Sequence, residues 1–80
     1  MAFNNRGTVY AKLLQDDHAL DDFNRAINLD PDYAEAYYNR SVIYRRHAEG
    51  VLALKDALKS RMLGADVPES YISEIQNITP

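Results

Sequence analysis

The sequence repeats itself at a fixed offset, so that the segment 3–32 aligns with the segment 37–66 without a gap. A period of this length is typical of repeat proteins, in which each unit buries its apolar face only against its neighbours. The period therefore predicts a repeat architecture and favours binding over catalysis as the general role. The identical pairs are Asn5/Asn39, Arg6/Arg40, Tyr10/Tyr44, Ala19/Ala53, Leu20/Leu54, Asp22/Asp56, Leu29/Leu63 and Asp32/Asp66.

Size and composition narrow the possible classes of protein. The chain has 80 residues, the size of one small domain, and it has no cysteine for disulfides or thiolate metal sites. Its net charge of −3 argues against a general nucleic-acid binder, which needs a basic surface. No apolar run is long enough to span a membrane, and the first residues lack the features of a signal peptide. We therefore expect a cytoplasmic domain without cofactor, membrane or nucleic-acid partner.

Apolar residues recur at helical spacing, and strand-like alternation is absent. The pattern predicts five helices: residues 3–14, a second helix capped by Asp16 or Asp17 and ending at Leu29, then 33–47, 51–63 and 66–78. Pro31 stops the second helix, and Gly64 is expected to be left-handed after the fourth. The predicted fold class is all-α, an antiparallel helix–turn–helix array. The expected buried residues include Gly7, Tyr10, Leu14, Ala19, Phe23, Ala26, Val51, Leu54, Ala57, Leu58, Met62, Tyr71, Ile72, Ile75 and Ile78.

The first unit resembles the tetratricopeptide repeat, a helix–turn–helix whose length matches the period of this sequence. The resemblance rests on Phe3, Gly7 and Tyr10 in the first helix, Ala19, Phe23 and Ala26 in the second, and Pro31 after it. The second unit keeps Tyr37, Ser41, Tyr44 and Ala53, but has Ala57, Ser60 and Ala65 at the last three positions.

We expect one domain over residues 1–80, with repeats at about 1–33 and 34–66 and a capping helix at about 67–78. Because Ala57 replaces a phenylalanine, Tyr71 and Ile75 of the capping helix are expected to fill the space that the ring leaves.

The resemblance implies a right-handed superhelix whose first helices in each repeat line a concave groove. In the family, such a groove commonly binds an extended peptide or a partner helix. The residues of this sequence that would face it are Asn4, Asn5, Thr8, Lys12, Glu35, Tyr38, Asn39, Val42, Arg45 and Arg46, with Glu69, Ile72, Ser73 and Gln76 from the capping helix.

One specialised form of the groove, a clamp for an acidic C-terminus, does not fit this chain. At the matching positions the sequence has Asn4, Thr8, Asn39, Glu69 and Ser73. Only Asn39 agrees with the clamp, and Glu69 would repel a carboxylate. We therefore do not expect this clamp.

Several residues have both a binding and a structural interpretation. Arg45 and Arg46 could form a cationic patch that binds an acidic peptide. Alternatively, they could lie in solvent at the C-terminus of their helix, where the helix dipole favours cations. Tyr38 is a candidate anchor because the packing stripe does not use it. Asn5 and Asn39 could hydrogen-bond a peptide backbone, or they could be residues common in the family that bind nothing here.

Arg6 and Arg40 recur at the period, and we expect them to be structural. Their stems would pack across a helix pair while their guanidinium groups reach water or Asp22 and Asp56.

The sequence thus predicts a protein-interaction module that binds a partner peptide or helix. Alternatives are self-association as a homodimer through the N-terminal face, where Phe3 lies, or a place in a longer array of repeats. A nucleic-acid role is a distant third. Catalysis is not expected, because no catalytic motif is present, and the Asp16-Asp17 and Asp21-Asp22 pairs are typical of a helix N-terminus.

Overall fold

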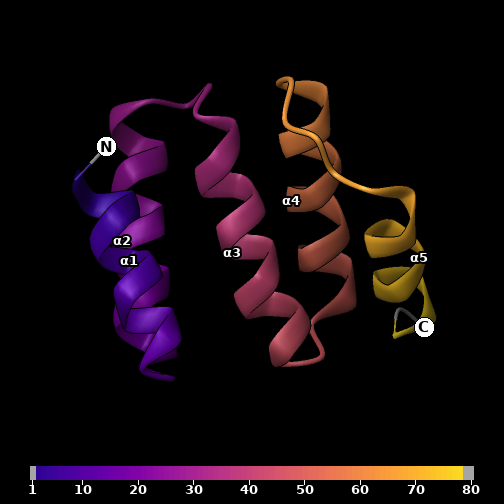
Figure 1. Ribbon diagram of the computed structural model, residues 1–80, viewed down its shortest axis with the longest axis horizontal. Helices are drawn as coiled ribbons and strands as arrows, with labels where there is room; N and C mark the ends of the chain where they lie inside the picture. The colour runs from indigo at the N-terminus through magenta and orange to yellow at the C-terminus, as the bar shows by residue number, and fades with distance from the viewer. Residues whose placement is uncertain (1, 79–80) are drawn as a thin grey trace.

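The computed structural model describes residues 2–78, and this part of the chain folds into five α-helices with no strand. Figure 1 shows the helices running up and down in sequence order from the N-terminal to the C-terminal end. The all-α helix–turn–helix fold expected from the sequence is therefore confirmed. The helices are α1 (Ala2–Lys12), α2 (Asp16–Leu29), α3 (Ala34–Arg46), α4 (Gly50–Met62) and α5 (Glu69–Asn77).

The helices form a stack rather than a closed bundle. Helix α1 packs on α2, α3 on α4, α2 on α3, and α4 on α5. The stack measures 31 × 26 × 16 Å, and its two termini lie at opposite ends of the long axis (Figure 1). Each helix thus buries itself mainly against its sequence neighbours, as the repeat period predicts.

The first core lies where α1 crosses α2 and where α2 meets α3. Phe23 is 1 % exposed, and it packs with Ala19 and Ile43, both fully buried. A Cβ atom built on Gly7 would lie only 2.7 Å from Cε1 of Phe23. The glycine therefore allows the backbone of α1 to approach the Phe23 ring, which explains the small residue expected at this crossing.

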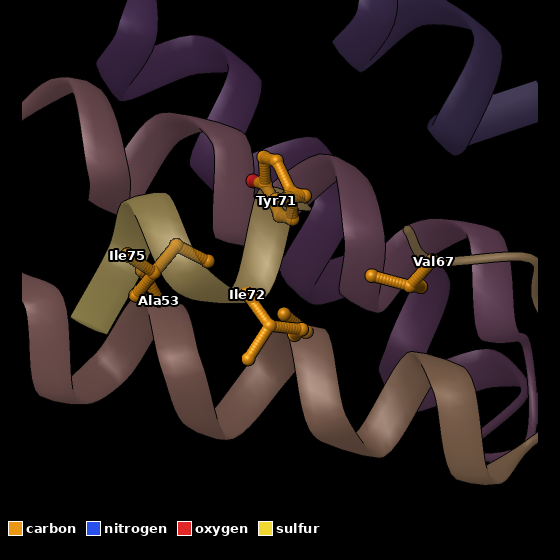
Figure 2. Close-up of a cluster of buried hydrophobic side chains, with 6 residues drawn as sticks. Ala53, Val67, Tyr71, Ile72 and Ile75 are labelled. Atoms are coloured by element: carbon orange, nitrogen blue, oxygen red, sulfur yellow. The ribbon is translucent and has the colours of Figure 1, made fainter. Parts of the chain in front are cut away.

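The second core lies between α4 and α5 (Figure 2). Tyr71 and Ile75 of α5 pack in one cluster with Ala53 and Ala57 of α4. The space left by the missing ring at position 57 is thus filled from α5, as expected. The hydroxyl oxygens of Tyr71 and Ser41 are 2.9 Å apart, so a polar contact joins α5 to α3 inside this core.

A bidentate ion pair recurs at the same place in both helix pairs. Arg6 donates two hydrogen bonds of 2.8 Å to Asp22, and Arg40 donates two of 2.7 and 2.9 Å to Asp56. Both aspartates are buried. The expectation that these guanidinium groups reach the aspartates is confirmed, so the repeated Arg and Asp positions join the two helices of each pair.

We expect the Arg6–Asp22 pair to make the free energy of unfolding depend on pH in the acidic range. The hydrogen bonds from Arg6 hold the pKa of Asp22 below its usual value, against the opposing effect of burial. The stabilisation is therefore complete above about pH 4, where the unfolded carboxyl ionises, and is lost as the pH falls through the lower folded pKa. Urea denaturation between about pH 2 and 7 should show this loss.

The matched variants are Asp22→Asn and Asp21→Asn. Asp21 is an exposed neighbour whose side chain pairs with Arg25, one turn away. We expect Asp22→Asn to be less stable at neutral pH and to depend less on pH below about 4, and Asp21→Asn to keep the original dependence. Equal slopes for Asp22→Asn and the original chain would contradict this assignment.

Five apolar residues expected in the core are exposed instead. Leu14 is 75 % exposed because α1 ends at Lys12, and it adopts φ 59° in the turn. On α4, Ala53 and Ala57 occupy the inner side and Leu54 packs beside them, whereas the three residues of α4 named below point outward. The exposed fractions are 65 % for Val51, 39 % for Leu58, 70 % for Met62 and 40 % for Ile78, which follows α5.

The turns show a regularity that the sequence does not reveal. Leu14 and Ala48, which occupy equivalent positions in the two repeats, both have positive φ, at 59° and 57°. The turn inside each helix pair is thus the same, although neither residue is glycine. Gly64 has the left-handed conformation expected after α4, with φ 106°. At the start of α5, Pro68 occupies the N-cap position rather than the first turn.

Candidate functional site

A hollow of about 210 Å³ opens between α1 and α3. Ala11, Phe23 and Val42 form its apolar floor, and Thr8, Lys12, Asn39 and Arg46 stand around it. A second hollow of about 310 Å³ lies against Val42, Arg45 and Arg46. Because both hollows share Val42 and Arg46, we call the combined surface the Val42 groove.

The structure brings together six of the residues expected to face a groove. Thr8, Lys12, Asn39, Val42, Arg45 and Arg46 all line the Val42 groove. The sequence pattern assigns Ala11 and Phe23 only to helix packing, yet they supply its floor. The small side chain at position 11 is the signal for this role, because it leaves space between α1 and α3 above the buried Phe23 ring.

Asn4, expected to face the groove, is fully buried instead. Its side chain lies against α3, where Oδ1 accepts a hydrogen bond of 3.0 Å from Nδ2 of Asn39. Its main-chain oxygen accepts a hydrogen bond of 2.9 Å from Thr8 Oγ1. Burial is the largest cause that raises the pKa of the nearby Tyr33, and the charge of Glu35 raises it further. The Asn4 amide opposes this rise. Asn4 therefore positions the groove wall and is not a contact for a ligand.

Tyr38, expected to be a groove anchor that helix packing does not use, takes part in packing instead. Its ring lies 5.1 Å from the Tyr71 ring, measured between centroids, and it packs on the second core. Burial raises the pKa of the Tyr71 hydroxyl, which is also hydrogen-bonded to Ser41. Tyr38 thus holds α3 against α5. Ile72, another expected groove residue, is only 2 % exposed and belongs to the same core.

The basic end of α3 is neither a free patch nor a simply solvated helix end. Arg46 and His47 both bind the carboxylate of Asp16 at the start of α2, with His47 Nε2 at 2.8 Å from Oδ2. Asp16 therefore does not cap α2; Gln15 occupies that position without a side-chain cap. Arg45 pairs with Glu74 of α5 at 2.6 Å.

These ion pairs fix the arginines at the groove without burying them. The side chains of Arg45 and Arg46 remain 41 % and 35 % exposed, and the Arg45 guanidinium lies 5.4 Å from the centroid of the Tyr71 ring. Their donors are thus held in place while still facing solvent. Lys12 is exposed and has no ion-pair partner among residues 2–78, so it is the groove cation free to bind an anion.

The remaining expected groove residues lie outside both hollows. Glu35 is exposed and accepts a hydrogen bond of 3.4 Å from the Tyr33 hydroxyl, and Glu69 pairs with Arg61 at 2.7 Å. Asn5, Ser73 and Gln76 are exposed. The groove is therefore built from α1 and α3 over Phe23 of α2, and α5 contributes to it through the Glu74 partner of Arg45.

Residues 2–78 contain no group of three His, Asp or Glu side chains placed to hold a metal ion. Within the same residues, none of the helices has the length and apolar character needed to cross a membrane.

Comparisons with known proteins agree with the paired-helix arrangement. A family model described as the tetratricopeptide repeat matches residues 1–33, which include α1 and α2. A second model of the same description matches residues 23–60, from within α2 to within α4. Neither the curated proteins nor the solved structures gave a significant match.

Proposed function

Because the chain belongs to the tetratricopeptide-repeat family, we propose that it is an interaction module that binds an extended segment of a partner protein in the Val42 groove. Repeats of this family generally mediate protein–protein interaction and are not catalytic. The observation that carries the proposal is the groove itself, with an apolar floor between the helices and cationic side chains around it.

The chemistry of the groove favours a particular kind of segment. An apolar side chain seated in the hollow would bury its surface against Val42 and Ala11, which are both partly exposed. Carboxylates next to it would meet Lys12 on one side and Arg45 on the other. We therefore propose a partner segment that carries an apolar residue between acidic ones.

Contacts within the chain already hold several side chains of the groove. Asn39 is held by Asn4, Arg46 by Asp16 and Arg45 by Glu74, so these side chains lose little freedom on binding. The partner segment therefore loses most of the conformational entropy that is lost on binding. An extended peptide of about eight residues would span 26 Å at roughly 3.3 Å per residue, the second dimension of the stack.

We expect Val42→Glu to weaken peptide binding by at least about tenfold, because it places a carboxylate in the apolar floor and repels an acidic segment. The probe is a synthetic peptide of about eight residues with one central leucine between glutamates, and its affinity is measured by calorimetry. Circular dichroism checks that the variant stays folded.

The matched control is Val9→Glu, the same change on the exposed outer face of α1. It should bind the peptide as the original chain does. Equal binding by Val42→Glu and the original chain, or no binding of the peptide to the original chain, would contradict the groove assignment.

A second candidate function is self-association through the outer face of α1. Val9 is 56 % exposed, whereas Ile43, its counterpart in the second repeat, is fully buried against the preceding helix pair. Leu13, one turn beyond Val9, is 60 % exposed. This face is thus suited to a second copy or to a further repeat. Sedimentation over a concentration series tests the homodimer: association abolished by Val9→Glu would support it, and a monomer throughout would exclude it.

A further inference from the structure

A third hollow, of about 510 Å³, lies between α2, α3 and α4. Its apolar lining comes from Ile27, Tyr37, Leu58 and Met62. It opens on the other side of the stack from the Val42 groove: at about 100° per residue, its α3 residues Tyr37 and Arg40 lie about 140° and about 160° around the helix from Val42, on either side of the opposite direction. The hollow is therefore separate from the proposed peptide site.

The outer side of α4 that borders this hollow differs from its counterpart in α2. Four residues of α4 form one stripe at helical spacing, namely Lys55, Leu58, Lys59 and Met62, which we call the α4 stripe. The equivalent residues of the first repeat, in α2, are Asp21, Asn24, Arg25 and Asn28. The duplication thus has apolar side chains in the second repeat where the first has amides.

The charges along the two stripes differ in the same way. In α2, Asp21 and Arg25 neutralise one another in an ion pair of 3.1 Å. In α4, Lys55 and Lys59 carry the same sign, and neither has an anionic partner within residues 2–78. The hollow therefore has two uncompensated positive charges, in a chain whose net charge is −3.

The apolar residues of the α4 stripe are open to solvent. Met62 is 70 % exposed and Leu58 is 39 % exposed, and they lie one helical turn apart beside the hollow. An apolar row on a helix next to a groove suits the apolar face of another helix. Unpaired lysines beside that row attract carboxylates and disfavour cationic partners.

We propose that the α4 stripe is a second docking surface, which takes an amphipathic helix carrying acidic residues from a partner protein. The apolar face of that helix would cover Leu58 and Met62, and its carboxylates would pair with Lys55 and Lys59. The neighbouring Arg40 does not compete for them, because Asp56 already binds its guanidinium. One chain could then hold two partner segments on opposite sides of the stack.

The test uses a fluorescent synthetic helix of about 18 residues with leucines at helical spacing and glutamates beside them, titrated with the full chain and followed by anisotropy. We expect Lys55→Glu with Lys59→Glu to weaken binding by at least about tenfold. The matched control is Lys12→Glu, which reverses an unpaired lysine of the Val42 groove, and it should leave the affinity unchanged. A peptide with lysine in place of glutamate should not bind.

A second variant changes the apolar contacts without altering charge. Leu58→Asn with Met62→Asn gives the α4 stripe the amides found in α2, and we expect it to weaken binding by a similar factor. Both replaced side chains are exposed, so the variant should fold, which circular dichroism checks. Nuclear magnetic resonance tests the same contacts without a variant. When the acidic helix is added to the original chain, we expect amide shifts at Leu58 and Lys59.

Three results would overturn the proposal. The first is no binding of the acidic helix to the original chain. The second is loss of binding in Lys12→Glu but not in the double lysine variant, which would place the helix in the Val42 groove. The third is a dimer of the original chain that Leu58→Asn with Met62→Asn abolishes, which would make a second copy the occupant of this surface.

Discussion

Phe23→Ala is expected to lower the free energy of unfolding by about 3–5 kcal/mol, the usual loss for a buried phenylalanine. The ring is 1 % exposed and lies between Gly7 of α1 and Ile43 of α3. The space cannot close easily, because Gly7 and Ala19, which border the ring, have no side chain long enough to fill it. A domain of this size has a total stability of about 3–5 kcal/mol, so the variant should be largely unfolded.

Circular dichroism and urea denaturation measure this effect directly. The control is Leu29→Ala, which removes a large apolar side chain that is 65 % exposed at the end of α2. It should change the free energy of unfolding by no more than about 0.5 kcal/mol. A folded Phe23→Ala variant with the original midpoint would show that α1, α2 and α3 are not packed around this ring.

Arg40→Leu is expected to be the next most damaging single change, at about 3 kcal/mol. The side chain of Arg40 is 21 % exposed, and that of its partner Asp56 is 5 % exposed. Arg40 also donates a hydrogen bond of 2.9 Å to Asn24, so one side chain joins α2, α3 and α4. Its removal would leave the Asp56 carboxylate buried without a cation or a hydrogen-bond donor from α3.

A double variant separates the buried charge from lost packing. Arg40→Leu with Asp56→Leu removes both charges, and we expect it to recover most of the stability, because apolar replacement of a whole buried pair is often close to neutral. Urea denaturation of the two single variants and the double variant gives the coupling energy. Additive losses without recovery would show that the pair contributes through packing alone.

Much of the fold could be predicted because its determinants are local. Helix α2 ends at Leu29 as expected, since the Asp30-Pro31 sequence stops it, and Gly64 has the expected left-handed conformation. The repeat period then indicates how helices pair, because each packs against its sequence neighbours. These signals lie within a few residues of the features that they predict.

Which side of α4 is buried could not be predicted in the same way. Helical periodicity treats every apolar residue as a candidate for the core, so it places Leu58 and Met62 inside. In the structure, Ala53 and Ala57 form the inner side of α4, and α5 packs over them. The path of α5 therefore decides which apolar residues are exposed, and that path is a tertiary feature.

The candidate site was likewise only partly predictable. Thr8, Lys12 and Val42 could be assigned to one groove, because the family resemblance implies a groove along the first helix of each repeat and helical spacing puts these residues on that side. Arg46 pairs with Asp16 of α2 and Arg45 with Glu74 of α5, and both partners are remote in the sequence. Such pairs depend on how helices are stacked, so the sequence left open whether this end of α3 was free.

The two proposed surfaces differ in shape and in the partner that they favour. The Val42 groove is a narrow hollow between α1 and α3 with cations around it, which suits an extended segment. The α4 stripe is a straight row along one helix, which suits another helix. Variants at Val42 and at Lys59 should therefore affect different partners, and neither residue is among the fully buried members of the two cores.

The most direct test of binding in the Val42 groove is amide shift mapping of the original chain with the extended leucine–glutamate peptide. We predict that the largest shifts fall on the groove residues Thr8, Lys12, Asn39, Val42 and Arg46. Shifts confined to α2 and α4, or to the outer face of α1 around Val9, would contradict the proposed function.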